Sequence, residues 1–165
     1  MGQQDKRHDK GKKYQIDDKD KEILTELQNN YRISYLDLSK KIGLAASTIH
    51  NRVQNMLKVG IIKEFDTLID PHEVGYETIA MLGISVNPQK MTEVAEKIAK
   101  YDEVQLVATT TGEHDIIFRV IAEKEKDLWR FINEKIKTID GVKNNIDVSS
   151  YIDVFKMTHK INFKI

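Results

Sequence analysis

The 165-residue chain contains no cysteine, only two prolines and a single tryptophan. The lack of cysteine excludes disulfide bonds, catalytic thiols and cysteine-ligated zinc or iron–sulfur centres. No apolar run approaches the roughly 20 residues that a membrane-spanning helix requires. The first 15 residues also lack the apolar core of a signal peptide. These absences predict a soluble, cytoplasmic protein without a membrane partner.

The remaining composition is sufficient to build folded domains. Hydrophobic residues make up 40% of the chain and charged residues 32%, a balance that fills a core and excludes a wholly disordered chain. The 26 basic and 26 acidic residues cancel, but they are unevenly placed. Residues 1–60 hold 12 basic and 8 acidic side chains, a net of +4, whereas residues 61–165 hold 14 and 18, a net of −4. This change of sign indicates two parts with different roles.

Residues 1–15 are expected to form a disordered basic tail. They are short of apolar side chains and contain five cations: Lys6, Arg7, Lys10, Lys12 and Lys13. Such a segment buries too little surface to fold by itself. Two interpretations stay open, a solvating tail and an arm that contacts DNA phosphates.

Residues 16–61 have the pattern of a helix-turn-helix domain. After a first helix with apolar residues at helical spacing, Ser34 can cap a second helix over 35–42. Gly43 suits the end of that helix, because glycine readily adopts positive φ. A third helix is expected over about 47–59. Three short helices with a tight glycine-containing link between the last two are typical of a DNA-binding helix-turn-helix.

The third helix is expected to read DNA. Its apolar side chains fall on one side, namely Ile49, Val53, Met56 and Leu57. The first two turns of its opposite face carry short hydroxyls, amides and an imidazole: Ser47, Thr48, His50, Asn51 and Gln54. Amides can bind an adenine edge bidentately, and an imidazole can meet guanine or phosphate acceptors. The alternative is the ordinary polar face of any surface helix.

Several cations around this helix are candidate phosphate ligands. Lys58 lies nearer the end of the third helix, where it would position the protein on the DNA backbone. Arg32, before the second helix, and Lys41, near its end, fit the same role, although a solvated helix end explains them nearly as well. Arg52, between the two faces of the third helix, can serve either as an intramolecular anchor or as a phosphate contact.

Beyond a linker strand at 62–76, which contains the break Asp70-Pro71, residues 77–165 are predicted to form a second domain. Its expected elements are strands at 78–86, 104–111 and 116–122, helices after Pro88 and at about 125–139, a strand over 146–155, and a last strand using Ile161, Phe163 and Ile165. This β-α-β-β-α-β order is the ferredoxin-like motif. The predicted fold class is therefore α+β, with a (winged) helix-turn-helix domain joined to a ferredoxin-like βαββαβ domain.

Four stretches of the chain resemble the leucine-responsive regulatory protein/AsnC (feast/famine) family of transcription regulators. They are Ile16-Asp17 with Lys21-Glu22-Ile23-Leu24, the segment YRISYLDLSKKIGLAASTIHNRVQNMLKVGIIKEF at 31–65, IDPHEVGY at 69–76, and TTTGEHDIIFRV at 109–120. The resemblance implies sequence-specific binding to double-stranded DNA, at a pseudo-palindromic operator. It also implies a homodimer or higher homo-oligomer formed through the second domain, and often a small amino-acid effector.

The family's Gly-x-x-Asp loop implies an effector site at Thr110, Thr111, Gly112 and Asp115. Backbone amides around Gly112 can take a carboxylate, and Asp115 can accept an α-ammonium group. The competing interpretation is that Gly112 permits a tight turn which Asp115 caps. Glu113 and His114 are candidates for an interface between dimers.

The sequence departs from the family pattern at four positions. Ala45 replaces the usual serine before the third helix, so the cap must come from elsewhere, with Ser47 as a candidate. His114 replaces the loop's usual aromatic residue. Ile146 and Val148 stand where many relatives have threonines near the effector, which weakens the inference to a free amino-acid ligand.

The sequence contains no nucleophile–base pair, GxSxG, P-loop, GxGxxG or histidine–carboxylate metal pattern that supports an enzyme. We predict a transcription regulator with no cofactor and no metal. Two alternatives remain. One is a tetrapyrrole enzyme resembling sirohaem decarboxylases, in which His114 and His159 would act. The other is an oligomeric ligand sensor that does not bind DNA.

Overall fold

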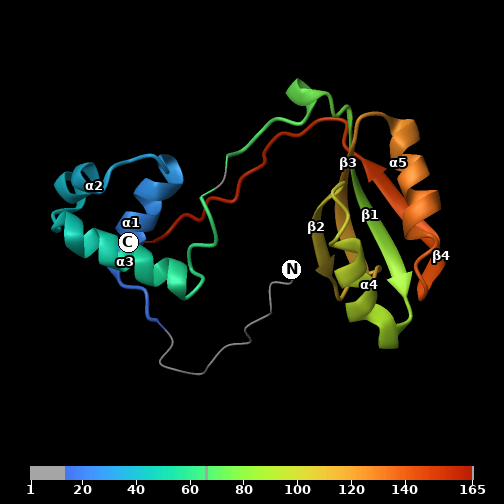
Figure 1. Ribbon diagram of the computed structural model, residues 1–165, viewed down its shortest axis with the longest axis horizontal. Helices are drawn as coiled ribbons and strands as arrows, with labels where there is room; N and C mark the ends of the chain where they lie inside the picture. The colour runs from blue at the N-terminus through green and yellow to red at the C-terminus, as the bar shows by residue number, and fades with distance from the viewer. Residues whose placement is uncertain (1–13, 66, 165) are drawn as a thin grey trace. The chain divides into compact units, whose positions relative to one another are not determined.

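The computed structural model describes residues 14–65 and 67–164, which fold as two compact units. The chain crosses from the first unit to the second between Thr67 and Leu68, and it returns between Met157 and Thr158 (Figure 1). Of the predicted basic tail at 1–15, only Tyr14 and Gln15 lie among the described residues.

The first unit is a helix-turn-helix of three short helices. They are α1 (Asp18–Asn29), α2 (Tyr35–Ile42) and α3 (Ala46–Lys58). Asp17 caps α1 through a reciprocal capping box with Asp20, and the Ser34 side chain accepts a hydrogen bond from the Asp37 amide at the start of α2. Gly43 ends α2 with φ 74°, a left-handed conformation that glycine adopts without strain.

The three helices enclose a small apolar core. Its buried members are Ile23, Leu24, Leu27, Leu38, Ile42, Ile49, Val53 and Met56. After α3 the chain turns back through Gly60, and the amides of Ile61 and Ile62 both donate to the Met56 carbonyl. The turn therefore brings the end of α3 back onto the same core, where Ile61 and Ile62 also pack.

The second unit has the βαββαβ order that the sequence predicts. Its elements are β1 (Thr78–Val86), α4 (Met91–Ile98), β2 (Val104–Thr109), β3 (Ile116–Ala122), α5 (Glu125–Phe131) and β4 (Val142–Ser150), with a short 3-10 turn at Pro88–Lys90 before α4. The strands form one sheet in the order β2-β3-β1-β4, and every neighbouring pair is antiparallel. The ferredoxin-like architecture is thus confirmed.

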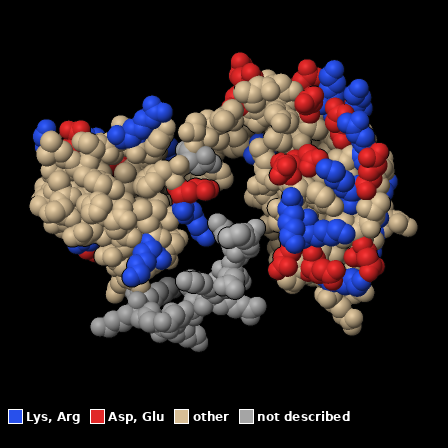
Figure 2. All heavy atoms as spheres, viewed as in Figure 1, with Lys and Arg blue, Asp and Glu red and all other residues tan. Residues whose placement is uncertain are grey.

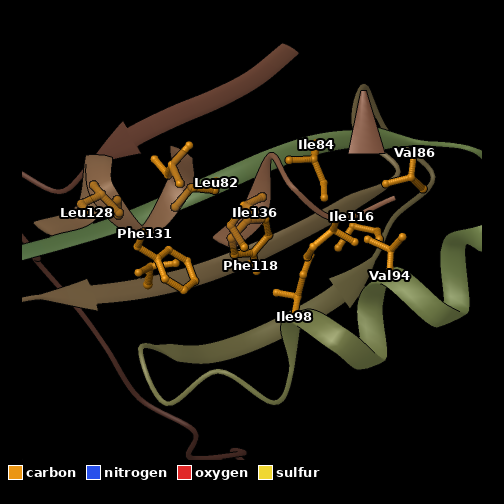
Figure 3. Packing of buried hydrophobic residues seen from close by; sticks show 14 of the residues in the cluster. Leu82, Ile84, Val86, Val94, Ile98, Ile116, Phe118, Leu128, Phe131 and Ile136 are labelled. Carbon is orange, nitrogen blue, oxygen red and sulfur yellow. The ribbon is translucent and has the colours of Figure 1, made fainter. Parts of the chain in front are cut away.

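Both helices pack on the same face of this sheet. Alternate residues of β1 and β3 point to that side: Ala80, Leu82, Ile84 and Val86 from β1, and Ile116, Phe118, Val120 and Ala122 from β3. Figure 3 shows Phe118 of β3 beside Phe131 and Ile136, and Ile116 of β3 beside Ile98 of α4. The alternation follows from the two-residue period of a strand. The opposite face, called the open face below, carries Met81, Gly83, Ile117, Arg119 and Ile121.

The predicted helix over 125–139 changes type partway. After Phe131 the backbone continues as a π-helix over Ile132–Ile136, in which the Lys137 amide donates to the Ile132 carbonyl at 2.9 Å. Ile132, Ile136 and Ile139 are all buried in the sheet core. The wider turn keeps these three isoleucines directed at the core, a constraint that helical periodicity alone does not reveal.

Two predicted strands are absent from the described residues. The linker strand at 62–76 is irregular apart from a 3-10 turn at His72–Val74, because no neighbouring strand offers it backbone partners. The last strand, expected to use Ile161 and Phe163, does not join the sheet, and the described residues from Thr158 onward belong to the first unit. The second unit therefore ends at Met157, before the predicted limit at 165, because Phe163 packs on the helical core instead.

Candidate DNA-binding and effector sites

The third helix separates its apolar and polar residues cleanly. Ile49, Val53 and Met56 are completely buried. Every predicted base-reading residue is exposed on the remaining surface, together with the cation at the helix end: Ser47, Thr48, His50, Asn51, Gln54 and Lys58, called the polar face of α3 below. Most of the first unit's surface visible in Figure 2 is uncharged, whereas the second unit shows many charges of both signs.

The start of α3 differs from the sequence-based expectation. Ala45 is the N-cap residue, and no side-chain capping hydrogen bond is present among the described residues. The prediction that Ser47 caps the helix is therefore wrong. Ser47 lies inside the first turn with its side chain exposed, so its hydroxyl remains on the polar face.

His50 and the predicted phosphate ligands have intramolecular neighbours. The His50 ring meets the Tyr35 ring edge-on, with centroids 5.3 Å apart. Lys41 forms a 2.6 Å ion pair with Glu26 of α1, although its side chain stays exposed. Arg32 donates from Nε to the Tyr31 hydroxyl at 2.9 Å. Only Lys58, among the predicted phosphate ligands, has neither a salt bridge nor a side-chain hydrogen bond within the described residues.

Arg52 is an intramolecular anchor, which decides between the two interpretations left open by the sequence. Its guanidinium lies 2.8 Å from carboxylate oxygens of both Asp17 and Asp20. Asp20 is only 1% exposed and also accepts a hydrogen bond from the Tyr14 hydroxyl at 3.0 Å. This cluster ties α3 to the start of α1, so the polar face of α3 is presented on a fixed support.

The hydrogen bonds of this cluster shift the pKa values of Asp17, Arg52 and Tyr14. The backbone amide of Asp20 and then the Arg52 guanidinium hold the pKa of Asp17 below its usual value. Hydrogen bonds to Asp20 and Asp17 raise the pKa of Arg52. Burial, then the hydrogen bond to Asp20, raises the pKa of Tyr14. All three shifts favour the protonation states present at neutral pH.

In the second unit, the predicted effector residues lie on the loop between β2 and β3. The Thr110 amide donates to the Asp115 carbonyl at 3.0 Å, and the Thr110 hydroxyl donates to the His114 carbonyl. Asp115 Oδ2 accepts a 2.8 Å hydrogen bond from the Val86 amide of β1. One Asp115 oxygen therefore has a structural role, and Thr111 and Gly112 are exposed at the tip of the loop.

Gly112 is not required by the local backbone. It is absent from the glycines with positive φ, and a Cβ added at this position would meet nothing within 4 Å. The loop bends at residues 111–113, so the interpretation of Gly112 as part of a tight turn stays open, but the turn does not depend on a positive φ at this position. Its hydrogen atoms face open space, so the backbone here is accessible to a ligand or to another chain.

His114 turns away from the loop tip and back over the sheet. A Cβ at Gly83 would lie only 2.2 Å from His114 Cδ2, so the ring packs directly on the β1 backbone. His114 Nε2 lies 3.5 Å from Asp147 Oδ2 on β4, the strand position opposite Gly83. Sequence reasoning missed Gly83, although a glycine inside an alternating strand is the usual sign of such a close approach.

The two departures in the last strand lie on the helix-covered side of the sheet. Ile146 and Val148 are half-buried and pack against the sheet core, opposite Ile84 and Leu82 of β1. They stabilise the side of the sheet that the helices cover. Their apolar character is accounted for by packing.

A hollow lies elsewhere on the second unit, between β3 and α5. Its lining residues are Tyr76, Glu103, Val120, Ile121, Ala122, Glu123, Asp127, Arg130, Phe131, Glu134 and Lys135. Two ion pairs, Glu103–Lys135 at 2.6 Å and Asp127–Arg130 at 2.5 Å, neutralise much of its charge. It includes none of the predicted effector residues.

The described residues, 14–65 and 67–164, offer neither a metal site nor a membrane span. No three histidine, aspartate or glutamate side chains there gather closely enough to hold a metal ion. None of the described helices combines the length and apolar character needed to cross a bilayer.

A helix-turn-helix unit followed by a βαββαβ unit with an exposed loop defines a two-domain DNA-binding regulator. The family model described as Lrp/AsnC ligand binding domain matches residues 79–161, and that for a winged helix-turn-helix DNA-binding domain matches residues 16–63. The chain belongs to the Lrp/AsnC family, and it is a DNA-binding transcription regulator.

Three relatives with similar sequences are transcriptional regulators of Pyrococcus and Methanocaldococcus species. An HTH-type transcriptional regulator of Pyrococcus horikoshii is 38% identical over 133 residues, covering 81% of this chain and 84% of its own length. The regulator FL11 of the same organism is 37% identical over 128 residues, covering 78% and 84%. Ptr1 of Methanocaldococcus jannaschii is 32% identical over 145 residues, covering 86% and 98%.

Solved structures have the same architecture. E. coli AsnC superposes with a TM-score of 0.81 and 29% identity, covering 88% of this chain and 97% of that one. A transcriptional regulator from Neisseria meningitidis, solved as a complex with L-Met, also gives a TM-score of 0.81, at 23% identity, covering 90% and 97%. The second likeness bears on the fold alone.

Proposed function

We propose that the polar face of α3 reads the base edges of a pseudo-palindromic operator from the major groove. The observation that carries this proposal is the arrangement of the helix itself. Three completely buried apolar residues and the Arg52 cluster fix α3 on its unit, while hydroxyl, amide and imidazole groups all point outward. Such groups match the donors and acceptors of the major groove.

The polar face divides into specifying and positioning residues. Ser47, Thr48, His50, Asn51 and Gln54 occupy the first turns, which enter the groove most deeply in helix-turn-helix proteins. Lys58 and Arg32 serve as phosphate contacts, which position the protein without reading sequence. Lys41 takes the same role by exchanging its exposed pairing with Glu26 for a phosphate.

Two copies of the chain would join through the open face of the sheet. Both helices of the unit pack on the other face, while Met81, Ile117 and Ile121 are only half-buried and Leu106 is 44% exposed. A second copy covering these side chains removes apolar surface from water, which favours association. A two-fold dimer presents two α3 helices to half-sites one helical turn, or a multiple of it, apart.

An amino-acid effector would bind at the β2–β3 loop. The backbone near Gly112 is open and can donate amides to a carboxylate. Asp115 uses Oδ2 for the Val86 amide, so its other oxygen remains for an α-ammonium group. Thr110 holds the loop in shape through its hydroxyl, and Thr111 stands exposed beside Gly112. The effector would change DNA binding by acting on the assembly.

This proposal assigns no catalytic role to the chain. His114 packs on Gly83 and faces Asp147 within its own sheet, so it is not directed at an open pocket. A tetrapyrrole enzyme would instead bind a porphyrin and show its visible absorption. Titration of the purified chain with sirohaem should leave the absorption spectrum of the free tetrapyrrole unchanged.

The experiment that tests DNA recognition is selection of bound fragments from the source genome at near-physiological salt, followed by sequencing. We expect a pseudo-palindromic site to be enriched over several rounds. Asn51→Ala and Gln54→Ala should each reduce discrimination between this site and scrambled DNA by roughly 1–3 kcal/mol. Asn144→Ala, an exposed amide deletion on β4, serves as the matched control. Weak, salt-sensitive and sequence-blind binding would refute base reading by α3.

A further inference from the structure

The described C-terminal residues, 158–164, are part of the DNA-binding unit. The Gln28 side chain on α1 holds Ile161 by both backbone groups: its Nε2 donates to the Ile161 carbonyl at 3.1 Å, and its Oε1 accepts from the Ile161 amide at 2.7 Å. A side-chain amide that pairs with one residue in this way fixes the register of the segment, as a neighbouring strand would.

Further contacts extend along the same segment. Lys160 Nζ donates to Asn29 Oδ1 at 3.2 Å, and Lys21 Nζ donates to the Lys164 carbonyl at 3.3 Å. Phe163 is half-buried against the helical core of the first unit. One apolar anchor and polar contacts on both sides of it dock this segment along α1, from its first turns to its last.

The consequence is that two chain segments, not one, join the units. The first crossing runs between Ile62, which packs on the helical core, and Thr78 at the start of β1, and so spans residues 63–77. The second runs between Tyr151, whose amide donates to the Ile79 carbonyl of β1, and Thr158, and spans only residues 152–157, of which Met157 still accepts a hydrogen bond from Arg119 of β3. At roughly 3.3–3.6 Å per extended residue, the second crossing reaches less than half as far as the first.

The shorter connection limits how far the units can separate, and two connections limit rotation more than one. A single linker of the first crossing's length would leave the DNA-binding unit free to reorient, as flexible linkers do. Docking of residues 158–164 adds a second, shorter connection to this linker. If the segment detached from α1, only the longer crossing would constrain the unit.

We propose that residues 158–164 act as a second tether that fixes the presentation of α3, so that the assembled protein selects operators by the spacing of their half-sites. Gln28 and Phe163 are positioning residues in this scheme, because they contact the tether and have no part in reading bases. The inference rests on the proposed binding of a two-fold dimer to a pseudo-palindrome. It adds that the spacing preference originates in the C-terminal segment.

The test compares the full chain with Gln28→Ala and with a chain ending at Met157. The second variant also loses Phe163 from the core, whereas Gln28→Ala keeps that anchor and removes only the paired hydrogen bonds. Gln89→Ala, an exposed amide deletion in the turn before α4, is the matched control. The rate of hydrogen exchange at the Ile161 amide reports directly whether the segment is docked. It should increase in Gln28→Ala and stay unchanged in Gln89→Ala.

Binding is then measured to three DNAs. The first is the selected operator, the second is the same operator with about 5 base pairs, or half a helical turn, inserted between its half-sites, and the third is a single half-site. The full chain and the control should prefer the native spacing by about 100-fold, the scale on which linked sites gain from matched geometry. Both tether variants should prefer it by about tenfold or less. Affinity for the single half-site should stay the same in all four proteins.

The outcomes separate this inference from the function on which it rests. If the full chain binds no operator specifically, the proposed function fails and the tether inference falls with it. If the full chain prefers the native spacing and both tether variants keep that preference undiminished, the tether inference alone is refuted. The tether inference would also be refuted if Gln28→Ala lost as much affinity for the single half-site as for the full operator. Equal losses would indicate damage to the DNA-binding unit itself.

Discussion

The His114 ring lies against the backbone of Gly83 so closely that a Cβ at position 83 would be 2.2 Å from His114 Cδ2. The contact links the β2–β3 loop to the open face of the sheet. It also places the imidazole 3.5 Å from a carboxylate oxygen of Asp147. The conformation of the loop thus depends on a glycine 31 positions earlier in the chain.

Gly83→Ala should displace His114 and destabilise the second unit. The ring and the strand backbone cannot both keep their places, and overpacking of this kind costs about 1–3 kcal/mol. Thermal unfolding of the variant measures the loss. Gly112→Ala is the matched control, because neither its φ nor its surroundings oppose a methyl group. Equal loss of stability in both variants would contradict the close contact at Gly83.

Arg52→Ala should destabilise the helix-turn-helix unit by about 2 kcal/mol, below the 3–5 kcal/mol of fully buried pairs. The change leaves the 1% exposed Asp20 carboxylate without its cation, but Arg52 itself retains 29% exposure and Tyr14 still donates to Asp20. Urea unfolding measures the difference. Arg130→Ala, which breaks an ion pair with a 63% exposed arginine side chain, should change stability by less than about 0.5 kcal/mol. Similar losses in both variants would contradict an anchoring role for Arg52.

Acid should weaken the same unit through Asp17. The pKa of Asp17 is lowered in the folded chain by the Asp20 amide and then by Arg52. The folded state therefore binds this proton less readily than the unfolded state. The stabilisation is fully present above the ordinary pKa of 3.8 and is lost as pH falls through that value towards the lower folded pKa.

Asp17→Asn keeps a side-chain acceptor for the α1 cap and removes the charge. We expect this variant to be less stable than the natural chain at pH 7, with a smaller difference at pH 3. Urea midpoints at pH 7, 5 and 3 provide the measurement. A difference between the two proteins that is constant over this range would show that Asp17 titration contributes nothing.

The open face of the sheet should control assembly. Ile117→Lys places a charge among half-buried apolar side chains of β3, where a second copy would have to desolvate it. Sedimentation velocity should show smaller species than the natural chain gives. Trp129→Lys, on α5 and 45% exposed, adds the same charge on the helical side and should leave the assembly unchanged. Dissociation by the second variant alone would place the interface on the helices.

The sequence predicts most of the elements, because their signals are local. The apolar spacing of the three N-terminal helices, the Ser34 cap and the left-handed end at Gly43 all depend on residues within one or two turns. The alternation in β1 and β3 likewise shows which side chains face the core. The polar face of α3 is exposed as the same periodicity indicates.

Local sequence patterns give wrong predictions where strand formation depends on hydrogen bonding to another part of the chain. Ile161 and Phe163 alternate as a strand would, yet they do not join the sheet, and the Gln28 side chain of α1 bonds both backbone groups of Ile161 instead. The linker at 62–76 is rich in strand-forming residues, but its described residues pair with no other strand. A strand exists only when a second backbone satisfies its hydrogen bonds, and one sequence segment does not contain that information.

The amino-acid sequence by itself therefore determines the helix-turn-helix, the βαββαβ order and the set of side chains that α3 exposes. Only the tertiary structure decides that Arg52 anchors on Asp17 and Asp20, that Asp115 bonds the Val86 amide, and that residues 158–164 return to α1. The first set depends on periods of two and 3.6 residues along the chain. The second joins groups far apart in sequence, whose distance is fixed only when the whole fold has closed.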